Sequence, residues 1–217
     1  MVKYISEFIG SFFLVSTVIG SGIMGYNLSN GIDGIALLGN TVATGAILYV
    51  IIKIFSPISG AHFNPAVSLI FFLKHELSIS ELIKYILSQL SGSLVAVFST
   101  HYIFKLNIIQ ISENIRGDSE MFLSEVIATF GLITTILFLK NKDHKSIPIA
   151  VALFITAGYW FTSSTSFANP AVTLARALTD TFTGIAPISI KYFIPGQLLG
   201  SILALLFHNL YAEKIFK

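Results

Sequence analysis

Long apolar runs dominate this sequence and restrict it to folds that a lipid bilayer surrounds. A membrane-spanning helix needs about 20 mostly apolar residues. Of the 217 residues, 54% are hydrophobic and 11% are charged, whereas soluble domains are about 25% charged. The sequence therefore predicts an all-α membrane protein with six transmembrane helices and no sizeable soluble domain. The predicted spans cover residues 4–23, 35–55, 82–104, 121–139, 147–161 and 192–211.

The charge balance and the lack of cysteine exclude several other classes of protein. Thirteen Lys and Arg against eleven Asp and Glu leave a formal charge of +2, which is too even and too dispersed for a nucleic-acid-binding surface. Without cysteine the chain has no disulfides, thiolate metal sites or thiol chemistry. We expect no nucleic-acid partner, no metal and no cofactor.

Two further apolar stretches, 63–72 and 167–178, are too short to cross a bilayer. At about 1.5 Å of rise per residue each covers roughly half of its thickness. Short surface helices would fit either stretch alone. Because the two stretches match in sequence, we expect two re-entrant half-helices instead.

Three landmarks recur in the same order about a hundred residues apart, and they predict an internal duplication. The matched positions are Glu7 and Glu125, Asn64 and Asn169, and Gln89 and Gln197. We expect one membrane domain, 1–217, with repeat halves at about 1–110 and 118–217. Three spans per half is an odd number, so the second half must enter the membrane inverted.

The distribution of basic residues favours an orientation with both termini in the cytoplasm. In that orientation nine of the thirteen Lys and Arg residues face the cytoplasm. We expect a multi-pass protein of the plasma membrane.

The sequence Asn-Pro-Ala-Val occurs near the start of both short stretches, at Asn64 and at Asn169. Asn is a good N-cap and Pro suits the first helical position, so Asn64 and Asn169 should cap buried helix starts. Irregular backbone inside a membrane must line a cavity or be packed in protein. The loops before the caps can therefore present a row of carbonyl acceptors. These belong to Gly60, Ala61, His62, Phe63, Thr165, Ser166, Phe167 and Ala168.

The two Asn-Pro-Ala-Val segments and the pair Glu7 and Glu125 resemble the aquaporin (major intrinsic protein) family, over essentially the whole chain. The resemblance implies one pore per subunit, a homotetramer in the lipid bilayer, and passive passage of small uncharged solutes without enzymatic chemistry. It implies that the amides of Asn64 and Asn169 donate to the solute at the pore centre. Two helix N-termini facing that centre should repel cations.

Two buried acids in a membrane need partners. The resemblance implies that Glu7 and Glu125 accept hydrogen bonds from the re-entrant loops and act as scaffold; a proton relay is the alternative. Gln89 and Gln197 are interpreted as structural bonds between helices. His62 either lines the cytoplasmic half of the pore or packs beside it.

The sequence departs from the family pattern at the outer constriction, where most members have an Arg three residues after the second Asn. That position is Val172, and spacing assigns the other constriction positions to Thr44, Ala157 and Ser166. These side chains predict a wide, neutral opening. Tyr159 or Trp160 would replace Ala157 if the fifth span shifts in register.

Arg176 lies one helical turn beyond Val172. It either reaches back over the pore mouth as a substitute or forms a salt bridge or solvated rim near Asp180. Residues 159–176 resemble a bacterial branch associated with arsenic resistance, so water, glycerol, urea and arsenous acid are the candidate solutes.

Two other functions remain open. An ion-coupled secondary transporter also uses inverted repeats and broken helices, but it would need acidic residues free to bind an ion. A non-conducting membrane adhesion protein would favour occluding side chains at the constriction.

Overall fold

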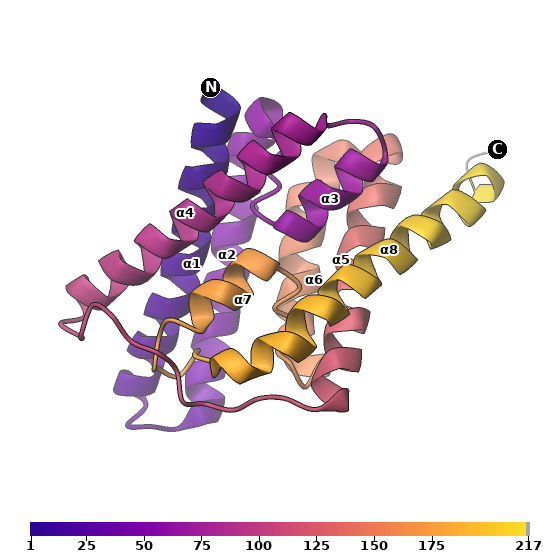
Figure 1. Ribbon diagram of the computed structural model, residues 1–217. Coiled ribbons are helices and arrows are strands. Elements are labelled where there is room, and N and C mark those ends of the chain that lie inside the picture. The colour runs from indigo at the N-terminus through magenta and orange to yellow at the C-terminus, as the bar shows by residue number, and fades with distance from the viewer. Residues whose placement is uncertain (216–217) are drawn as a thin grey trace.

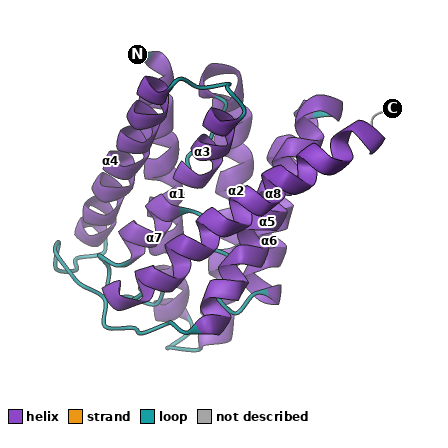
Figure 2. Ribbon diagram, turned by 45° about the vertical axis from the view of Figure 1, so that its right-hand side comes forward, coloured by secondary structure: helices purple, strands orange, loops and turns teal. Residues whose placement is uncertain are grey.

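The computed structural model describes residues 1–215, and every regular element in that range is helical (Figure 2). Five helices are long and apolar enough to cross a membrane, and α6 is the shorter sixth span, with 15 residues. Two short helices lie between the spans. The predicted all-α membrane fold is confirmed. The bounds are α1 (Val2–Leu28), α2 (Asp33–Ser59), α3 (Pro65–Leu73), α4 (Ile79–Ile103), α5 (Ser119–Lys142), α6 (Ile147–Phe161), α7 (Pro170–Arg176) and α8 (Ile190–Ile215), with 3-10 turns at His144–Ser146 and Pro187–Ser189.

The helices form two groups of three, with a half-helix associated with each group (Figure 1). Helix α1 packs against α2 and α4, α5 packs against α6 and α8, and α2 contacts α6 between the groups. Helix α1 begins and α8 ends at the same end of the molecule. The second group thus repeats the order of the first in the opposite orientation, as an inverted repeat requires.

The half-helices α3 and α7 join the two groups. Each packs against the third span of its own group and against the third span of the other: α3 contacts α4 and α8, and α7 contacts α8 and α4. The two half-helices also contact each other. Their N-terminal ends are therefore fixed by both halves of the chain.

The half-helices begin at the predicted caps. The side-chain oxygen of Asn64 accepts a hydrogen bond from the backbone N–H of Ala66 at 2.9 Å, and that of Asn169 accepts from Ala171 at 3.0 Å. Helix α7 ends at Arg176, two residues before the predicted end of the apolar stretch. It ends there because the next residues bond three positions back, in 3-10 fashion.

Close helix packing depends on two glycines at matched positions of the repeat. A Cβ atom added at Gly92 of α4 would collide with the backbone carbonyl of Phe8 in α1. One added at Gly200 of α8 would collide with the backbone carbonyl of Val126 in α5. Both collisions involve backbone, so any side chain at either position would force the helices apart.

Candidate functional site

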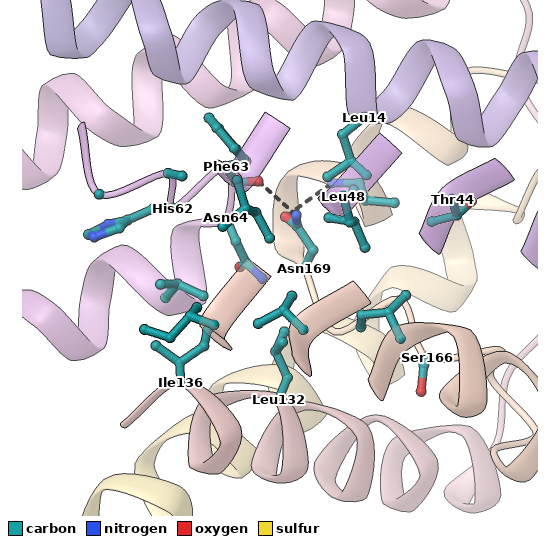
Figure 3. A pocket seen from close by; sticks show the side chains of 18 of the residues that line it. Leu14, Thr44, Leu48, His62, Phe63, Asn64, Leu132, Ile136, Ser166 and Asn169 are labelled. Carbon is teal, nitrogen blue, oxygen red and sulfur yellow. Dashed lines mark hydrogen bonds between the residues drawn. The ribbon is translucent and has the colours of Figure 1, made fainter. Parts of the chain in front are cut away.

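A cavity of about 410 Å³ runs through the centre of the protein. It extends from Lys140 at one end, past Asn64 and Asn169, to Arg176 at the other. Figure 3 shows Leu14 and Leu48 on one side of the Asn pair and Leu132 and Ile136 on the other. The wall beside the pair is apolar, so its few polar groups determine what can hydrogen-bond inside. The aliphatic lining includes Leu14, Val18, Leu48, Ile52, Val67, Leu132, Ile136, Ile147, Val151 and Ile155.

The two Asn side chains cross-link the two re-entrant loops. The amide nitrogen of Asn64 donates to the carbonyl of Ala168 at 2.7 Å. The amide nitrogen of Asn169 donates to the carbonyl of Phe63 at 2.8 Å, and Figure 3 draws this second bond. Each side-chain amide has two N–H groups. In the described part of the chain one N–H of each amide is used, which leaves the other available at mid-cavity.

The loops before the caps share a strained backbone. Positive φ angles occur at Gly60 (86°), Ala61 (53°) and Phe63 (48°) in the first loop. They recur 105 residues later at Thr165 (61°), Ser166 (48°) and Ala168 (48°), where no residue is glycine. Such angles cost of order 1–3 kcal/mol at non-glycine residues and persist where the surroundings impose them. The same conformation has therefore been imposed twice.

Glu7 organises the first loop from a fully buried position. Its carboxylate accepts hydrogen bonds from the backbone N–H groups of His62 at 2.9 Å and Phe63 at 2.6 Å. The hydroxyl of Ser59 at 2.7 Å and the amide of Gln89 at 2.8 Å also donate to it. Four donors on one carboxylate offset the cost of burying its charge.

Glu125 organises the second loop in the same way. It is fully buried and accepts from the N–H groups of Phe167 at 3.0 Å and Ala168 at 2.8 Å. Gln197 donates to it at 2.6 Å and also to Thr173 at 2.8 Å. The matched acids thus contact matched loop residues.

The Arg176 end of the cavity differs from the opening that the small side chains predict. Thr44, Ser166 and Val172 line the cavity, but Ala157 does not and is exposed. Tyr159 lies there instead, and its hydroxyl is 3.2 Å from that of Thr44. The assignment of Ala157 is therefore corrected to Tyr159. The reason is that the buried positions of α6 recur every three to four residues, at Pro148, Val151, Ala152, Ile155, Gly158 and Tyr159.

Arg176 lines the same end of the cavity. Only 4% of the residue is exposed, so it does not form a solvated rim. Its Nε donates to the carbonyl of Thr183, and its guanidinium carbon lies 3.5 Å from the centre of the Phe167 ring. No salt bridge to Asp180 occurs in the described chain. The side chain is thus turned toward the cavity that Val172 also lines.

Sequence reasoning missed a second arginine beside this end, Arg116, because it lies in the irregular connection between α4 and α5. One of its terminal nitrogens donates to the carbonyl of Ser163 at 2.9 Å, and the other lies 3.5 Å from the hydroxyl of Thr165. Burial lowers the pKa of Arg116 from its ordinary value, and the negative charge of Glu125 opposes this effect. Arginine stays protonated at neutral pH.

The opposite end of the cavity is aromatic and basic. His62 lines it, with one ring nitrogen 3.0 Å from the hydroxyl of Ser68 and its ring 4.5 Å from that of Phe71. Lys140 lies over Phe71 at 4.5 Å and forms an ion pair with Glu76. Lys140 is one of the nine basic residues that the favoured orientation places on the cytoplasmic side. Its place at the cavity could not be read from the sequence, because the packing of α5 beside α3 determines it.

Comparisons with known proteins agree with this geometry. Residues 1–156 match the family described as Major intrinsic protein. The chain is 45% identical over 203 residues to the aquaglyceroporin AqpS of Rhizobium meliloti (strain 1021), which covers 94% of this chain and 87% of the relative. It is 29% identical over 208 residues to aquaporin NIP2-1 of Zea mays, which covers 92% of this chain and 68% of the relative.

The fold is similar to that of the aquaglyceroporin from Plasmodium falciparum, solved by X-ray crystallography. The TM-score is 0.73 at 20% identity, over 95% of this chain and 94% of the other. The family is one of channels and not of enzymes. With the cavity, the paired half-helices and the sequence matches taken together, the chain belongs to the major intrinsic protein (aquaporin) family and is a passive membrane channel.

Proposed function

We propose that the central cavity conducts small uncharged solutes, with water and glycerol foremost. The observation that supports this most is the pair of crossed amides, each with one free N–H, in the middle of an apolar wall. A solute that enters loses hydrogen bonds to water, which costs free energy unless they are replaced. The amides of Asn64 and Asn169 and the loop carbonyls replace these hydrogen bonds for the hydroxyl groups of solutes that pass one behind another.

Several features of the pore centre favour neutral solutes. The N-termini of α3 and α7 both point at the Asn pair, and each contributes roughly half a positive charge there. Arg176 adds a full charge at one end. A cation would lose its hydration shell and meet a positive potential, so cations are excluded while polar neutral molecules pass.

The names of the relatives support glycerol as a solute: two are aquaglyceroporins. Urea and arsenous acid are also small and uncharged at neutral pH, and we include them as candidate solutes. Their order is set by the narrowest part of the cavity.

The selective constriction lies at the Arg176 end in this proposal. Tyr159 supplies bulk, and Arg176 supplies the positive charge that is missing at Val172. Thr44 and Ser166 supply hydroxyl groups. This opening is narrower and more positive than the one predicted from the four small side chains alone. Arg176 thus acts as the substitute for the constriction Arg from one turn further along α7.

Neither alternative function has an observation in its favour. An ion-coupled transporter needs an acid free to bind an ion, but the carboxylates of Glu7 and Glu125 are engaged by the loops. An adhesion protein would need no cavity, yet one of about 410 Å³ is present. We therefore retain the scaffold role for both acids.

We further propose that 1–217 is one channel domain with repeat halves 1–110 and 118–217, and that four copies associate in the plasma membrane. The recurring φ angles of the two loops support the halves. Both termini would lie in the cytoplasm, which makes the Lys140 end of the cavity the inner mouth and the Arg176 end the outer mouth.

Stopped-flow light scattering on proteoliposomes tests this proposal. Permeabilities to water, glycerol, urea and arsenous acid are compared with those of protein-free vesicles of the same lipid. We expect water and glycerol to be accelerated and potassium flux to be unchanged. The proposal would be contradicted if the protein accelerated potassium flux, or if it accelerated the flux of no neutral solute.

A further inference from the structure

A second cavity, of about 250 Å³, lies at the outer mouth beyond the constriction. Arg116 and Arg176 both line it, together with Tyr159 and Thr165. Their guanidinium carbons lie 5.6 Å and 3.5 Å from the centre of the same ring, that of Phe167. The two carbons are therefore at most 9.1 Å apart, the sum of these distances.

Most donors of the two guanidinium groups are unused. Each guanidinium has five N–H donors. Arg116 uses two of its nitrogens, toward Ser163 and Thr165, and Arg176 uses only Nε, toward Thr183. Among the described residues no further hydrogen bond engages the remaining donors, and both side chains line the cavity.

The two charges also lack a partner of opposite sign. The salt bridges of the described residues are Lys3–Glu81 and Lys140–Glu76, and neither includes an arginine. Asp33 lines the same cavity but is exposed and bonds to neither guanidinium. The charge of Glu125 acts on both arginines, yet its oxygens are engaged by the loop and Gln197. Two cations thus share a partly buried cavity, and no carboxylate of the described residues is bonded to either guanidinium, which is costly.

We propose that the outer cavity binds one small tetrahedral oxyanion, of the inorganic phosphate class, between Arg116 and Arg176. Guanidinium groups bind such anions with two parallel, charge-assisted hydrogen bonds each. The separation allows a single anion to contact both groups. The anion would supply the missing counter-charge, and Thr165 and Tyr159 lie on the same wall.

The anion site is not needed for conduction of neutral solutes, but an anion bound there should affect their entry. Arg176 belongs to both the constriction and the anion site, so a bound anion lies directly over the outer mouth. External oxyanion should then slow glycerol entry from that side without passing through the pore. The effect should weaken with ionic strength, because salt screens the two charges.

Isothermal titration calorimetry of the purified protein with inorganic phosphate tests the site without reference to flux. We expect saturable binding of one phosphate per chain, and Arg116→Gln should weaken it at least tenfold. Lys191→Gln is the matched control, because Lys191 is an exposed cation over Tyr192 that does not line the cavity; it should bind phosphate as the wild type does. Chloride at the same ionic strength should compete poorly.

The absence of saturable phosphate binding to the wild-type protein would overturn the proposal, as would equal binding by Arg116→Gln and the wild type. Equal competition by chloride would also overturn it, because it would indicate a diffuse positive field. The melting temperature and tetramer yield of Arg116→Gln without phosphate show whether the variant is folded. A channel that conducts glycerol but binds no phosphate would leave the proposed function intact and reject only this site.

Discussion

The guanidinium of Arg176 lies over the ring of Phe167, with 3.5 Å between the guanidinium carbon and the ring centre. Counting back 105 residues gives Phe71 and His62, whose rings are 4.5 Å apart at the other end of the cavity. The repeat therefore has a close pair of side chains at each end of the cavity, and in the second pair the α7 member is the cation Arg176. Such contacts over aromatic rings stabilise a cation by about 0.5–2 kcal/mol and fix where its charge lies.

Arg176→Ala should raise the permeability to glycerol and urea several-fold relative to water, because the Arg176 end of the cavity loses bulk and charge together. The loss of the hydrogen bond to Thr183 should also cost about 1.5–3 kcal/mol of stability. Val172→Arg should change selectivity less, since a cation already lies there. If Val172→Arg narrowed the solute range strongly and Arg176→Ala did nothing, Arg176 would not be the substitute. Stopped-flow permeabilities and thermal unfolding measure both effects.

Replacing Tyr159 tests the corrected register of α6. Tyr159→Ala should widen the Arg176 end of the cavity and raise glycerol permeability, whereas Tyr159→Phe, which loses only the contact with Thr44, should have a small effect. Ala157→Leu places bulk on the exposed face of the same helix and should leave permeability unchanged. If Ala157→Leu blocked glycerol while Tyr159→Ala had no effect, the spacing-based assignment would be right after all.

Glu7→Gln and Glu125→Gln should each lower the stability of the protein. An amide has N–H groups that would face the loop N–H donors, so at least one buried donor would be left unpaired at a cost of about 1–3 kcal/mol, more for charged bonds. Melting temperature and the yield of folded protein in detergent report the change. Glu113→Gln, at an exposed loop position, is the control and should be neutral. If the two acids formed a proton relay, flux through the Glu→Gln variants would become independent of pH while their stability stayed unchanged.

Asn64→Asp or Asn169→Asp should abolish most solute flux. Each change removes the N–H that bonds the opposite loop carbonyl and places a negative charge against that carbonyl. Glycerol permeability per mole of reconstituted protein measures the loss. Asn107→Asp, in the exposed connection after α4, should retain flux. Wild-type flux and yield in both pore variants would remove the assigned role of the pair.

Local signals account for the parts of the site that the sequence predicted. The helix starts at Asn64 and Asn169 follow from cap chemistry and from the Pro that follows each cap. The matched partners Glu7 and Glu125 could be identified because duplication places them at equivalent positions and because buried acids need donors. The half-helices followed from the length of their apolar stretches together with the match between their sequences.

Tertiary packing determines the parts that the sequence did not predict. Counting twelve residues back from Asn169 assumes a fixed loop length, and an error of two residues exchanges Ala157 for Tyr159. The buried period of α6 would have favoured Tyr159. Arg116 lies in a connection without periodicity, so no sequence pattern places it beside Arg176. Lys140 reads as a loop charge until α5 is packed beside α3.

The proposed path of the solute is the cavity between the two half-helices. Glycerol permeability of proteoliposomes tests it most directly when wild type is compared with Leu132→Trp, which fills the cavity wall beside the Asn pair. Leu123→Trp is the matched control on the same helix, because that residue is 57% exposed and does not line the cavity. We expect rapid glycerol entry with wild type and Leu123→Trp, and entry at the protein-free rate with Leu132→Trp. Equal glycerol entry through folded wild-type and Leu132→Trp protein would contradict this path.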